Sequence, residues 1–347
     1  MEHFDIHIHM NSDAARAVLP TMQKQGAERY VLLSLGAYRG DLTQNEAVLY
    51  AKALDPEHSY AFYAPTHPIN GEPVPDYLAE LKRWLNAGCD GLKLIETKAN
   101  CAKATGVRLD DMAFDPMFAY CEEHGVPILW HNGDPATYWD PKKCPPKAIR
   151  NGWSYIDGSF LSLEELYAIT ETVLDRHPRL KVTFAHFYFV SDDPAHAGRM
   201  MEKYPNLRFD LTPGPAIFGG FTENADFFRS FFLRYADRIL LGSDTNVAAD
   251  GSDYGPLVTG LVERFLRTDE EYDFFGFRVK GFKLPEDILE KILRSNAAAF
   301  VGDVPRAISP EGAVAACQEV ISLLEARQAP GAALGRRLAE DLKKTIW

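Results

Sequence analysis

Eight short apolar runs, separated by longer segments of helical periodicity, constrain the fold of this chain more than any other feature. Runs of this kind that alternate with helical segments are typical of βαβ units, whose strands form a parallel sheet. Eight such units predict an α/β fold in which the sheet closes into a (β/α)8, or TIM, barrel. The runs cover residues 4–9, 30–35, 60–65, 91–96, 127–131, 181–186, 207–212 and 238–243.

Helix signals lie between the predicted strands, as this fold requires. Asp115 and Pro116 predict the start of a helix, and Gly125 predicts its end just before the fifth run. Ser162 and Glu165 have the spacing of a capping box and precede an amphipathic segment. We therefore expect helices to cover the outside of the barrel.

The end of the chain departs from a minimal barrel. After about residue 310 an Ala-, Leu- and Glu-rich tail follows, interrupted at residues 330–331, and it predicts two further helices. We expect one barrel domain over residues 1–310 and a C-terminal helical extension, residues 311–347, packed on its outside.

Charge and cysteine content exclude several classes of protein. The formal net charge of −12 over 347 residues disfavours a nucleic-acid partner, because phosphate neutralisation needs a basic surface. The sequence predicts neither a membrane span, which needs about 18 consecutive apolar residues, nor a signal peptide. Five cysteines without Cys-x-x-Cys spacing indicate free thiols. We expect a cytoplasmic protein with a small-molecule substrate and no membrane partner; a homo-oligomer remains an open alternative.

The first predicted strand carries two imidazoles, His7 and His9. Side chains alternate along a strand, so both point to one face, with Asp5 behind them. Paired neutral imidazoles on a rigid face form half of a transition-metal site.

Other polar residues fall where predicted strands lie or end. Lys93 lies on the fourth strand, His131 ends the fifth, His186 ends the sixth, and Asp244 follows the eighth. In a (β/α)8 barrel the carboxyl ends of all strands meet at one mouth, where active sites are built. The sequence therefore predicts one polar site that combines these residues with the histidines of the first strand.

Taken together, these motifs resemble the amidohydrolase superfamily, and within it the metal-dependent hydrolase branch related to aminocarboxymuconate-semialdehyde decarboxylase. The resemblance extends from residue 4 to about residue 300. The matching segments are residues 5–9, 91–94, 127–131, 184–186, 241–244 and 296–298.

The resemblance implies that His7, His9, His131 and Asp244 bind one divalent metal, most often Zn²⁺, with Mn²⁺ or Fe²⁺ as alternatives. Three imidazoles and a carboxylate suit zinc, and a further position is left for water or substrate. Asp244 can also accept the proton of an attacking water. His186 is expected to orient that water or polarise a substrate oxygen, and a role as a metal ligand is the alternative.

Lys93 has two interpretations. In binuclear members of the superfamily a lysine on the fourth strand is carboxylated and bridges two metals, and residues 91–94 are similar to that strand. In the branch that the chain resembles most, a similar lysine accompanies one metal, and its ammonium sits within the barrel or meets an anionic substrate. We favour one metal and an uncarboxylated Lys93.

Residues 132–160 form an unusually long connection rich in Pro, Gly and aromatic residues. Connections of this length at the catalytic face are often lids or binding loops. Trp153 offers a flat surface for a planar ligand, and the fork of Arg150 suits a carboxylate. We expect a substrate lid here, with a packed surface excursion as the alternative.

Two segments depart from the family pattern beside expected site residues. Phe187, Tyr188 and Phe189 follow His186, where the family often has glycines, and we expect these bulky groups to narrow the pocket. Thr245 follows Asp244 where Trp-Pro or Ala-Pro is frequent. Both departures make the substrate unpredictable by analogy.

Three classes of function are consistent with these residues. The first is a metal-dependent hydrolase that uses a metal-activated water on a small cyclic amide, ester or lactone. The second is a non-oxidative decarboxylase of an unsaturated or aromatic carboxylic acid. The third is a binding protein that has kept its metal without catalysis.

Overall fold

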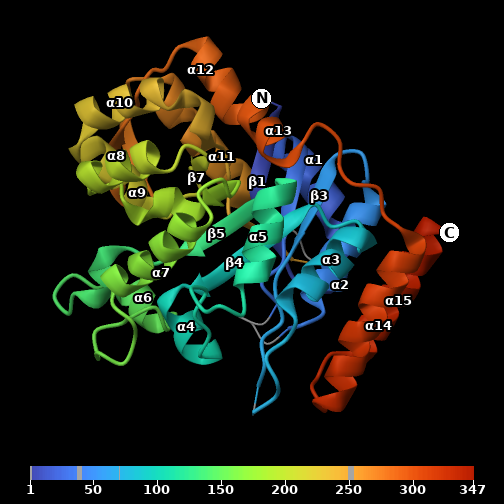
Figure 1. Ribbon diagram of the computed structural model, residues 1–347. Coiled ribbons are helices and arrows are strands. Elements are labelled where there is room, and N and C mark those ends of the chain that lie inside the picture. Colours follow the sequence, from blue (N-terminus) through green and yellow to red (C-terminus); the bar gives the residue numbers. More distant parts are fainter. Residues whose placement is uncertain (1, 37–40, 70, 249–253) are drawn as a thin grey trace.

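The computed structural model describes residues 2–36, 41–69, 71–248 and 254–347. Within these residues a nine-stranded parallel sheet forms the centre of the molecule (Figure 1). From β1 to β8, strands that are consecutive in the chain are neighbours in the sheet, and β9 pairs with the free side of β1. The strands are β1 (His3–Met10), β2 (Ala27–Leu33), β3 (Ser59–Tyr63), β4 (Gly91–Thr97), β5 (Ile128–Asn132), β6 (Val182–Phe184), β7 (Leu207–Asp210), β8 (Ile239–Leu240) and β9 (Thr245–Val247).

The segment between β8 and β9 brings the two edges of the sheet together. β8 pairs with β7 and β9 pairs with β1, so residues 241–244 connect both edges. The backbone N–H of Ile6 donates to the carbonyl of Leu241 over 3.1 Å, and that of Asp244 donates to the carbonyl of His7 over 2.9 Å. The sheet is therefore curled on itself in a TIM-barrel-like α/β fold. Of the predicted eighth run, residues 238–243, only β8 forms a strand; β9 follows Asp244, which has a φ of 58°.

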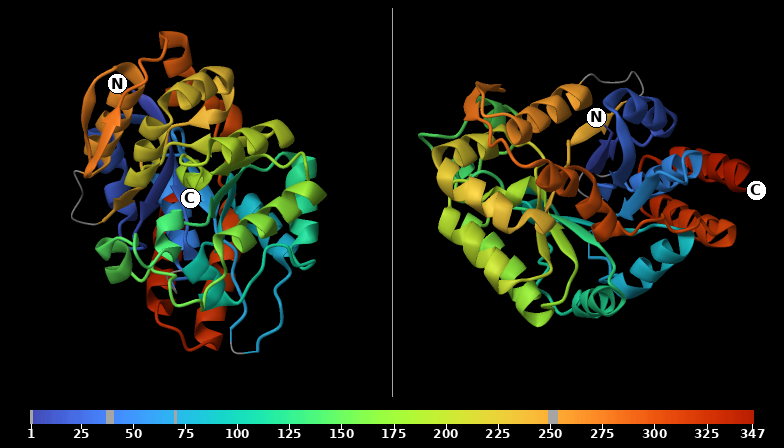
Figure 2. Two further views of the ribbon diagram at one scale, coloured as in Figure 1. Left: turned by 90° about the vertical axis from the view of Figure 1, so that its left-hand side faces the viewer. Right: turned by 90° about the horizontal axis from the view of Figure 1, so that it is seen from above.

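Helices surround the curled sheet, as the right-hand view of Figure 2 shows. The connection after β9 also contains an antiparallel hairpin of β10 (Glu271–Phe274) and β11 (Phe277–Lys280). The helices are α1 (Val18–Gln25), α2 (Gln44–Leu54), α3 (Tyr77–Ala87), α4 (Ala99–Thr105), α5 (Asp115–His124), α6 (Pro146–Arg150), α7 (Leu163–Arg176), α8 (Pro194–Lys203), α9 (Pro215–Glu223), α10 (Ala225–Arg234), α11 (Tyr254–Arg267), α12 (Glu286–Glu290), α13 (Asn296–Val301), α14 (Pro310–Ala326) and α15 (Ala332–Ile346).

Local sequence signals fix several helix ends. Gly125 ends α5 in the left-handed conformation, with a φ of 62°, which glycine adopts without a steric penalty. Ser162 and Glu165 make both hydrogen bonds of the predicted capping box at the start of α7. The bounds of α5 and the start of α7 thus lie where the sequence pattern predicts them.

The tail of the chain forms α14 and α15, which lie side by side on the outside of the molecule (Figure 1). α14 packs against α3, and α15 packs against α2. In the described part of the chain, no helix has the length and apolar character needed to cross a bilayer.

Apolar side chains fill the interior of the curled sheet near the starts of the strands. Phe4 and Tyr60 pack there, and Phe300 of α13 reaches the same cluster and contacts Phe62, with ring centroids 6.1 Å apart. The polar residues described next lie nearer to the carboxyl ends of the strands.

Candidate metal centre

A bulge in β1 orients His7 and His9. The register between β1 and β2 gives β1 one more residue than β2 between Asp5 and Ile8. Such an extra residue changes the face that the following side chains occupy, and bulges are frequent beside active sites. The rings of His7 and His9 consequently point toward one another inside the curled sheet, with centroids 4.9 Å apart.

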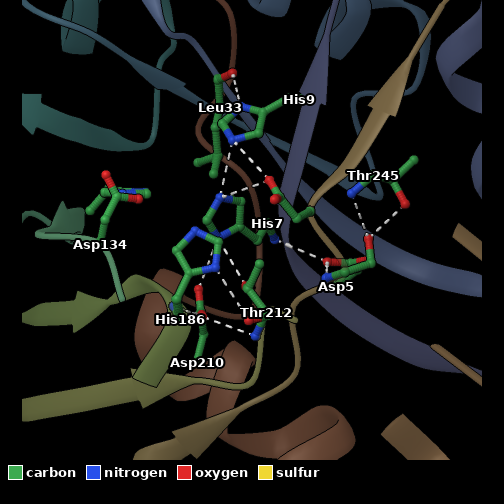
Figure 3. A network of polar contacts seen from close by, with 12 residues as sticks. Asp5, His7, His9, Leu33, Asp134, His186, Asp210, Thr212 and Thr245 are labelled. Atoms are coloured by element: carbon green, nitrogen blue, oxygen red, sulfur yellow. Dashed lines mark hydrogen bonds and ion pairs between the residues drawn. The ribbon is translucent and has the colours of Figure 1, made fainter. Parts of the chain in front are cut away.

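Three potential ligand atoms meet at this point, from His7, His9 and Asp244. Figure 3 shows the two histidine rings that point toward one another. The Nε2 atoms of His7 and His9 lie 3.1 Å apart. Oδ1 of Asp244 lies 3.7 Å from Nε2 of His7 and 3.5 Å from Nε2 of His9. Asp244 comes from the segment that joins the two edges of the sheet, so the closure of the sheet also assembles this group.

The spacing of the three atoms fits a divalent cation. Ligands bound tetrahedrally to zinc at 2.0–2.2 Å are separated by about 3.3–3.6 Å from each other, close to the three distances found here. The side chains of His7 and His9 are only 1% and 9% exposed, whereas the carboxylate side chain of Asp244 is 35% exposed. The group is therefore open on the side of Asp244, where a water or a substrate can approach.

Hydrogen bonds behind the two imidazoles hold their rings. Nδ1 of His7 donates to Oδ2 of Asp210 over 2.9 Å, and Nδ1 of His9 donates to the carbonyl of Leu33 over 3.3 Å (Figure 3). With the proton on Nδ1, each Nε2 keeps its lone pair toward the centre of the group. This is the usual outer arrangement of metal-binding histidines.

Burial keeps His7 neutral. It lowers the pKa of His7 well below its ordinary value, and nearby Lys93 and His131 lower that pKa further. Burial raises the pKa of Asp210 to about 6, against the opposing effects of Thr212, the backbone N–H of His186 and Lys93. A neutral His7 that donates to an ionised Asp210 at neutral pH is ready to bind a metal.

His186 lies in an unusual left-handed turn after β6. Residues 186–189 all have positive φ, between 53° and 56°, and none of them is glycine. Each such residue costs about 1–2 kcal/mol, and strain of this kind concentrates at functional sites. The turn places the ring of His186 against His7 and His131, with centroid separations of 5.5 Å and 4.8 Å.

The turn also separates the three bulky residues that follow His186. Phe187 and Tyr188 are fully buried in the core, so the expectation that all three would narrow the pocket is wrong. Phe189 alone lies beside the site, stacked on His186 with ring centroids 5.0 Å apart. The two residues are three positions apart, and the segment has three residues per helical turn, so their side chains lie one above the other.

His131 and Lys93 lie in the same interior. His131 is not part of the three-residue ligand group; its Nε2 donates to the carbonyl of Gly133 over 3.0 Å. Lys93 is fully buried, and it affects the pKa of His7, His131 and His186. The structure thus places all the predicted site residues of the strands in one region.

Sequence reasoning missed Asp210 and Thr212, which bond to His7 and to the backbone of the turn. Oδ1 of Asp210 accepts from the N–H of His186 over 2.7 Å and from the N–H of Thr212 over 3.1 Å. Both residues stand in the seventh predicted strand, residues 207–212. A carboxylate between Phe209 and Leu211, near the carboxyl end of a predicted strand, was the signal that could have identified Asp210.

The connection after β5 is anchored by a buried ion pair. Lys98, which follows β4, pairs with Asp134, and Tyr155 donates to the other oxygen of Asp134 over 2.6 Å. The ammonium of Lys98 also lies 5.3 Å from the ring centroid of Trp153. Trp153 is partly buried in this cluster, whereas Arg150, at the end of α6, is exposed.

Comparison with known proteins identifies related sequences and folds. A sequence model of the amidohydrolase family matches residues 4–302. No curated protein gave a significant match. An uncharacterized TIM-barrel protein from Bordetella bronchiseptica is 16% identical, with a TM-score of 0.54, and the match covers 87% of this chain and 99% of that chain.

Two enzymes of known structure are also similar in fold. 5-Carboxyvanillate decarboxylase from Sphingomonas paucimobilis is 14% identical, with a TM-score of 0.51 and coverage of 86% of this chain and 98% of that chain. IDCase from Metarhizium anisopliae is 12% identical, with a TM-score of 0.54 and coverage of 86% and 97% respectively. At these identities the similarity concerns the fold.

Proposed function

The chain belongs to the amidohydrolase family, and from this premise we propose that it is a metal-dependent hydrolase of a small cyclic amide, ester or lactone. The observation that carries the proposal is the convergence of His7, His9 and Asp244 at distances that suit one divalent ion. Nitrogen and carboxylate ligands favour Zn²⁺. A bound metal would lower the pKa of a coordinated water so that hydroxide is available near neutral pH.

We further propose His131 as a third imidazole ligand. Its Nε2–H is engaged by the carbonyl of Gly133, which leaves the lone pair of Nδ1 for a metal. Burial, together with nearby Lys98, lowers the pKa of His131 to about 4, so the ring is neutral at physiological pH. The hydrogen bond to Gly133 would fix the orientation of the ring.

Two residues supply proton chemistry in this proposal. Asp244 is the most exposed member of the group, and its carboxylate would accept the proton of the attacking water. Nδ1 of His186 donates to the carbonyl of Thr212 over 3.3 Å, so Nε2 is a hydrogen-bond acceptor. An acceptor suits the orientation of a water better than the polarisation of a substrate oxygen, and we assign His186 to the water.

Non-oxidative decarboxylation is the second candidate. The observation that favours it is Lys93, a buried amine in the interior that holds the histidines. An ammonium there could hold the substrate's carboxylate. It could also donate a proton to the carbon from which carbon dioxide has left. One solved structure of the same fold is a 5-carboxyvanillate decarboxylase.

Metal analysis combined with product analysis tests both candidates. Purified protein should hold about one ion per chain. His7→Ala and Asp244→Asn should lose the ion, while His124→Ala, an exposed histidine on α5, should retain it. Incorporation of ¹⁸O from labelled water with an intact carbon skeleton identifies a hydrolase, and release of carbon dioxide identifies a decarboxylase. Full metal content in both ligand variants would contradict the proposed centre.

A further inference from the structure

Four buried polar residues form a closed ring of hydrogen bonds beside the candidate metal centre. Asp5 of β1, Ser243 and Thr245 are fully buried, and Gln25, the last residue of α1, is 6% exposed. Buried polar groups are costly unless they are paired, and a network in which all members are paired holds them in one arrangement. Neither Gln25 nor Thr245 belongs to the group of three potential ligands.

The amide of Gln25 closes the ring with both of its ends. Its Nε2 donates to Oδ2 of Asp5 over 2.5 Å, and its Oε1 accepts from the hydroxyl of Thr245 over 3.1 Å. On the other side of the ring, the backbone N–H of Ser243 donates to Oδ1 of Asp5 over 3.1 Å. The hydroxyl of Ser243 donates to that of Thr245 over 2.8 Å. The ring therefore includes both residues that flank Asp244.

Asp244, between these two residues, has an uncommon backbone conformation. Its φ of 58° lies in the left-handed region, which residues other than glycine seldom adopt. Its backbone N–H donates to the carbonyl of His7 over 2.9 Å. The hydrogen bonds of Ser243 and Thr245 oppose a return of Asp244 to negative φ, and such a return would turn its carboxylate away from His7 and His9.

The first turn of α11 covers the contact between Gln25 and Thr245. A Cβ added at Gly255 would lie 2.1 Å from Oε1 of Gln25 and 2.6 Å from Oγ1 of Thr245. Only a residue without a side chain lets the helix backbone approach so closely. Gly255 therefore shields this hydrogen bond from water and leaves the amide of Gln25 no room to turn.

From these contacts we propose that Gln25 is a positioning residue, which acts through Thr245 to hold Asp244 in its left-handed conformation. The proposal rests on the proposed function for the role of Asp244 as a metal ligand, and it holds for hydrolysis and for decarboxylation alike. The alternative is a ring that only fills the space between α1 and β1. Loss of such a ring would weaken the whole fold and would not act on Asp244 in particular.

Hydrogen exchange of single backbone amides in the metal-free protein separates these two roles. Gln25→Met keeps the length of the side chain and removes both of its hydrogen bonds. We expect the amide of Asp244 to exchange about 10-fold faster in this variant. The amide of Leu211, which donates to the carbonyl of Leu240 between β7 and β8, should keep its rate. Equal acceleration at both amides, or an unchanged rate at Asp244, would overturn the proposal.

Zinc affinity reports on the consequence for the ligand group. Thr245→Val keeps the shape of the side chain and removes its hydroxyl, and we expect this variant and Gln25→Met each to bind zinc about 10-fold more weakly. Thr245→Ser keeps the hydroxyl and should retain the wild-type affinity. Gln23→Met, the same change at an exposed position of α1, should also retain it. Wild-type affinity in both Gln25→Met and Thr245→Val would overturn the proposal.

A second variant covers the case in which Gln25→Met does not fold. Gly255→Ala retains all four residues of the ring and places a methyl group against the amide of Gln25, so it should speed exchange at Asp244 and weaken zinc binding. Gly260→Ala, on an open face of the same helix, should do neither. Wild-type exchange at Asp244 in Gly255→Ala would overturn the proposal. If the wild-type protein binds no zinc, the proposed function is wrong, whereas exchange at Asp244 still decides the role of Gln25.

Discussion

Asp210 accepts a hydrogen bond from Nδ1 of His7 over 2.9 Å, although 203 positions separate the two residues in the chain. The contact joins β7 to β1, which are not neighbours in the sheet. It fixes the tautomer of His7 and directs the lone pair of Nε2 toward His9 and Asp244. A residue outside the group of three potential ligands thus orients one member of that group.

Removal of this partner should weaken metal binding without removing a ligand. Asp210→Asn keeps the shape of the side chain and loses its charge, and we expect metal affinity to fall by about 10- to 100-fold. Competition with a fluorescent chelator measures the change. Asp175→Asn, which alters an exposed carboxylate on α7, is the control and should leave the affinity unchanged.

Removal of the metal itself should lower stability. An ion that binds only the folded chain stabilises it by about 4 kcal/mol when its concentration is 1,000 times the dissociation constant. A chelator should therefore lower the melting temperature of the wild-type protein, and zinc should restore it. His9→Ala should show the lower melting temperature from the start and respond to neither reagent. An identical response of this variant and the wild type would argue against the centre.

Sequence patterns predict the repeating parts of this molecule better than its irregular parts. The strands follow from their alternation with amphipathic segments, and α5 and α7 follow from local capping residues. The bulge in β1 and the left-handed turn at residues 186–189 carry no local signal, because no glycine marks the turn. At both positive-φ positions the N–H group makes a long-range contact instead: that of His186 donates to Asp210, and that of Asp244 donates to the carbonyl of His7.

The candidate site likewise contains residues that the sequence predicts and residues that only the structure reveals. The grouping of His7, His9 and Asp244 was predictable because their residue types are typical of metal ligands and they lie on or just after predicted strands. Asp210 was missed because its role depends on a contact across the interior of the sheet. Nζ of Lys93 has no hydrogen-bond partner among the described residues, and this is also invisible in the sequence, since it depends on what Asp210 and Asp244 already bind.

Two residues of the predicted lid, Trp153 and Arg150, differ in burial in the structure, although the sequence analysis assigned both to substrate binding. Trp153 packs partly buried beside Lys98, so Trp153→Ala should cost roughly 1–3 kcal/mol of stability. Arg150 is exposed, and Arg150→Ala should change stability by less than about 0.5 kcal/mol. Denaturant unfolding measures both values. If Arg150→Ala lowers turnover at unchanged stability, the predicted role of Arg150 in the lid is supported. If turnover is unchanged, the prediction for Arg150 is wrong.

The last prediction concerns Glu46, a fully buried carboxyl of α2 beneath the C-terminal helices. Its two oxygens have no hydrogen-bond partner within the described residues. α15 crosses directly above it, since a Cβ added at Gly335 would lie 3.2 Å from Oε2 of Glu46. Burial, with a smaller effect of Asp41, raises the pKa of Glu46 from 4.5 to about 8.

This raised pKa makes the stability of the protein depend on pH with a defined sign. The stabilising effect of proton binding to Glu46 is complete below pH 4.5 and is lost as the pH rises through about 8. The full loss is on the order of 5 kcal/mol, because each pKa unit corresponds to about 1.4 kcal/mol. Glu46→Gln stays neutral at every pH, so its stability should fall less between pH 5 and pH 9 than that of the wild type. Glu340→Gln, an exposed change on α15, should behave as the wild type does. Parallel stability curves for the wild type and Glu46→Gln would mean that Glu46 is paired or ionised in the folded protein, and the prediction would then be wrong.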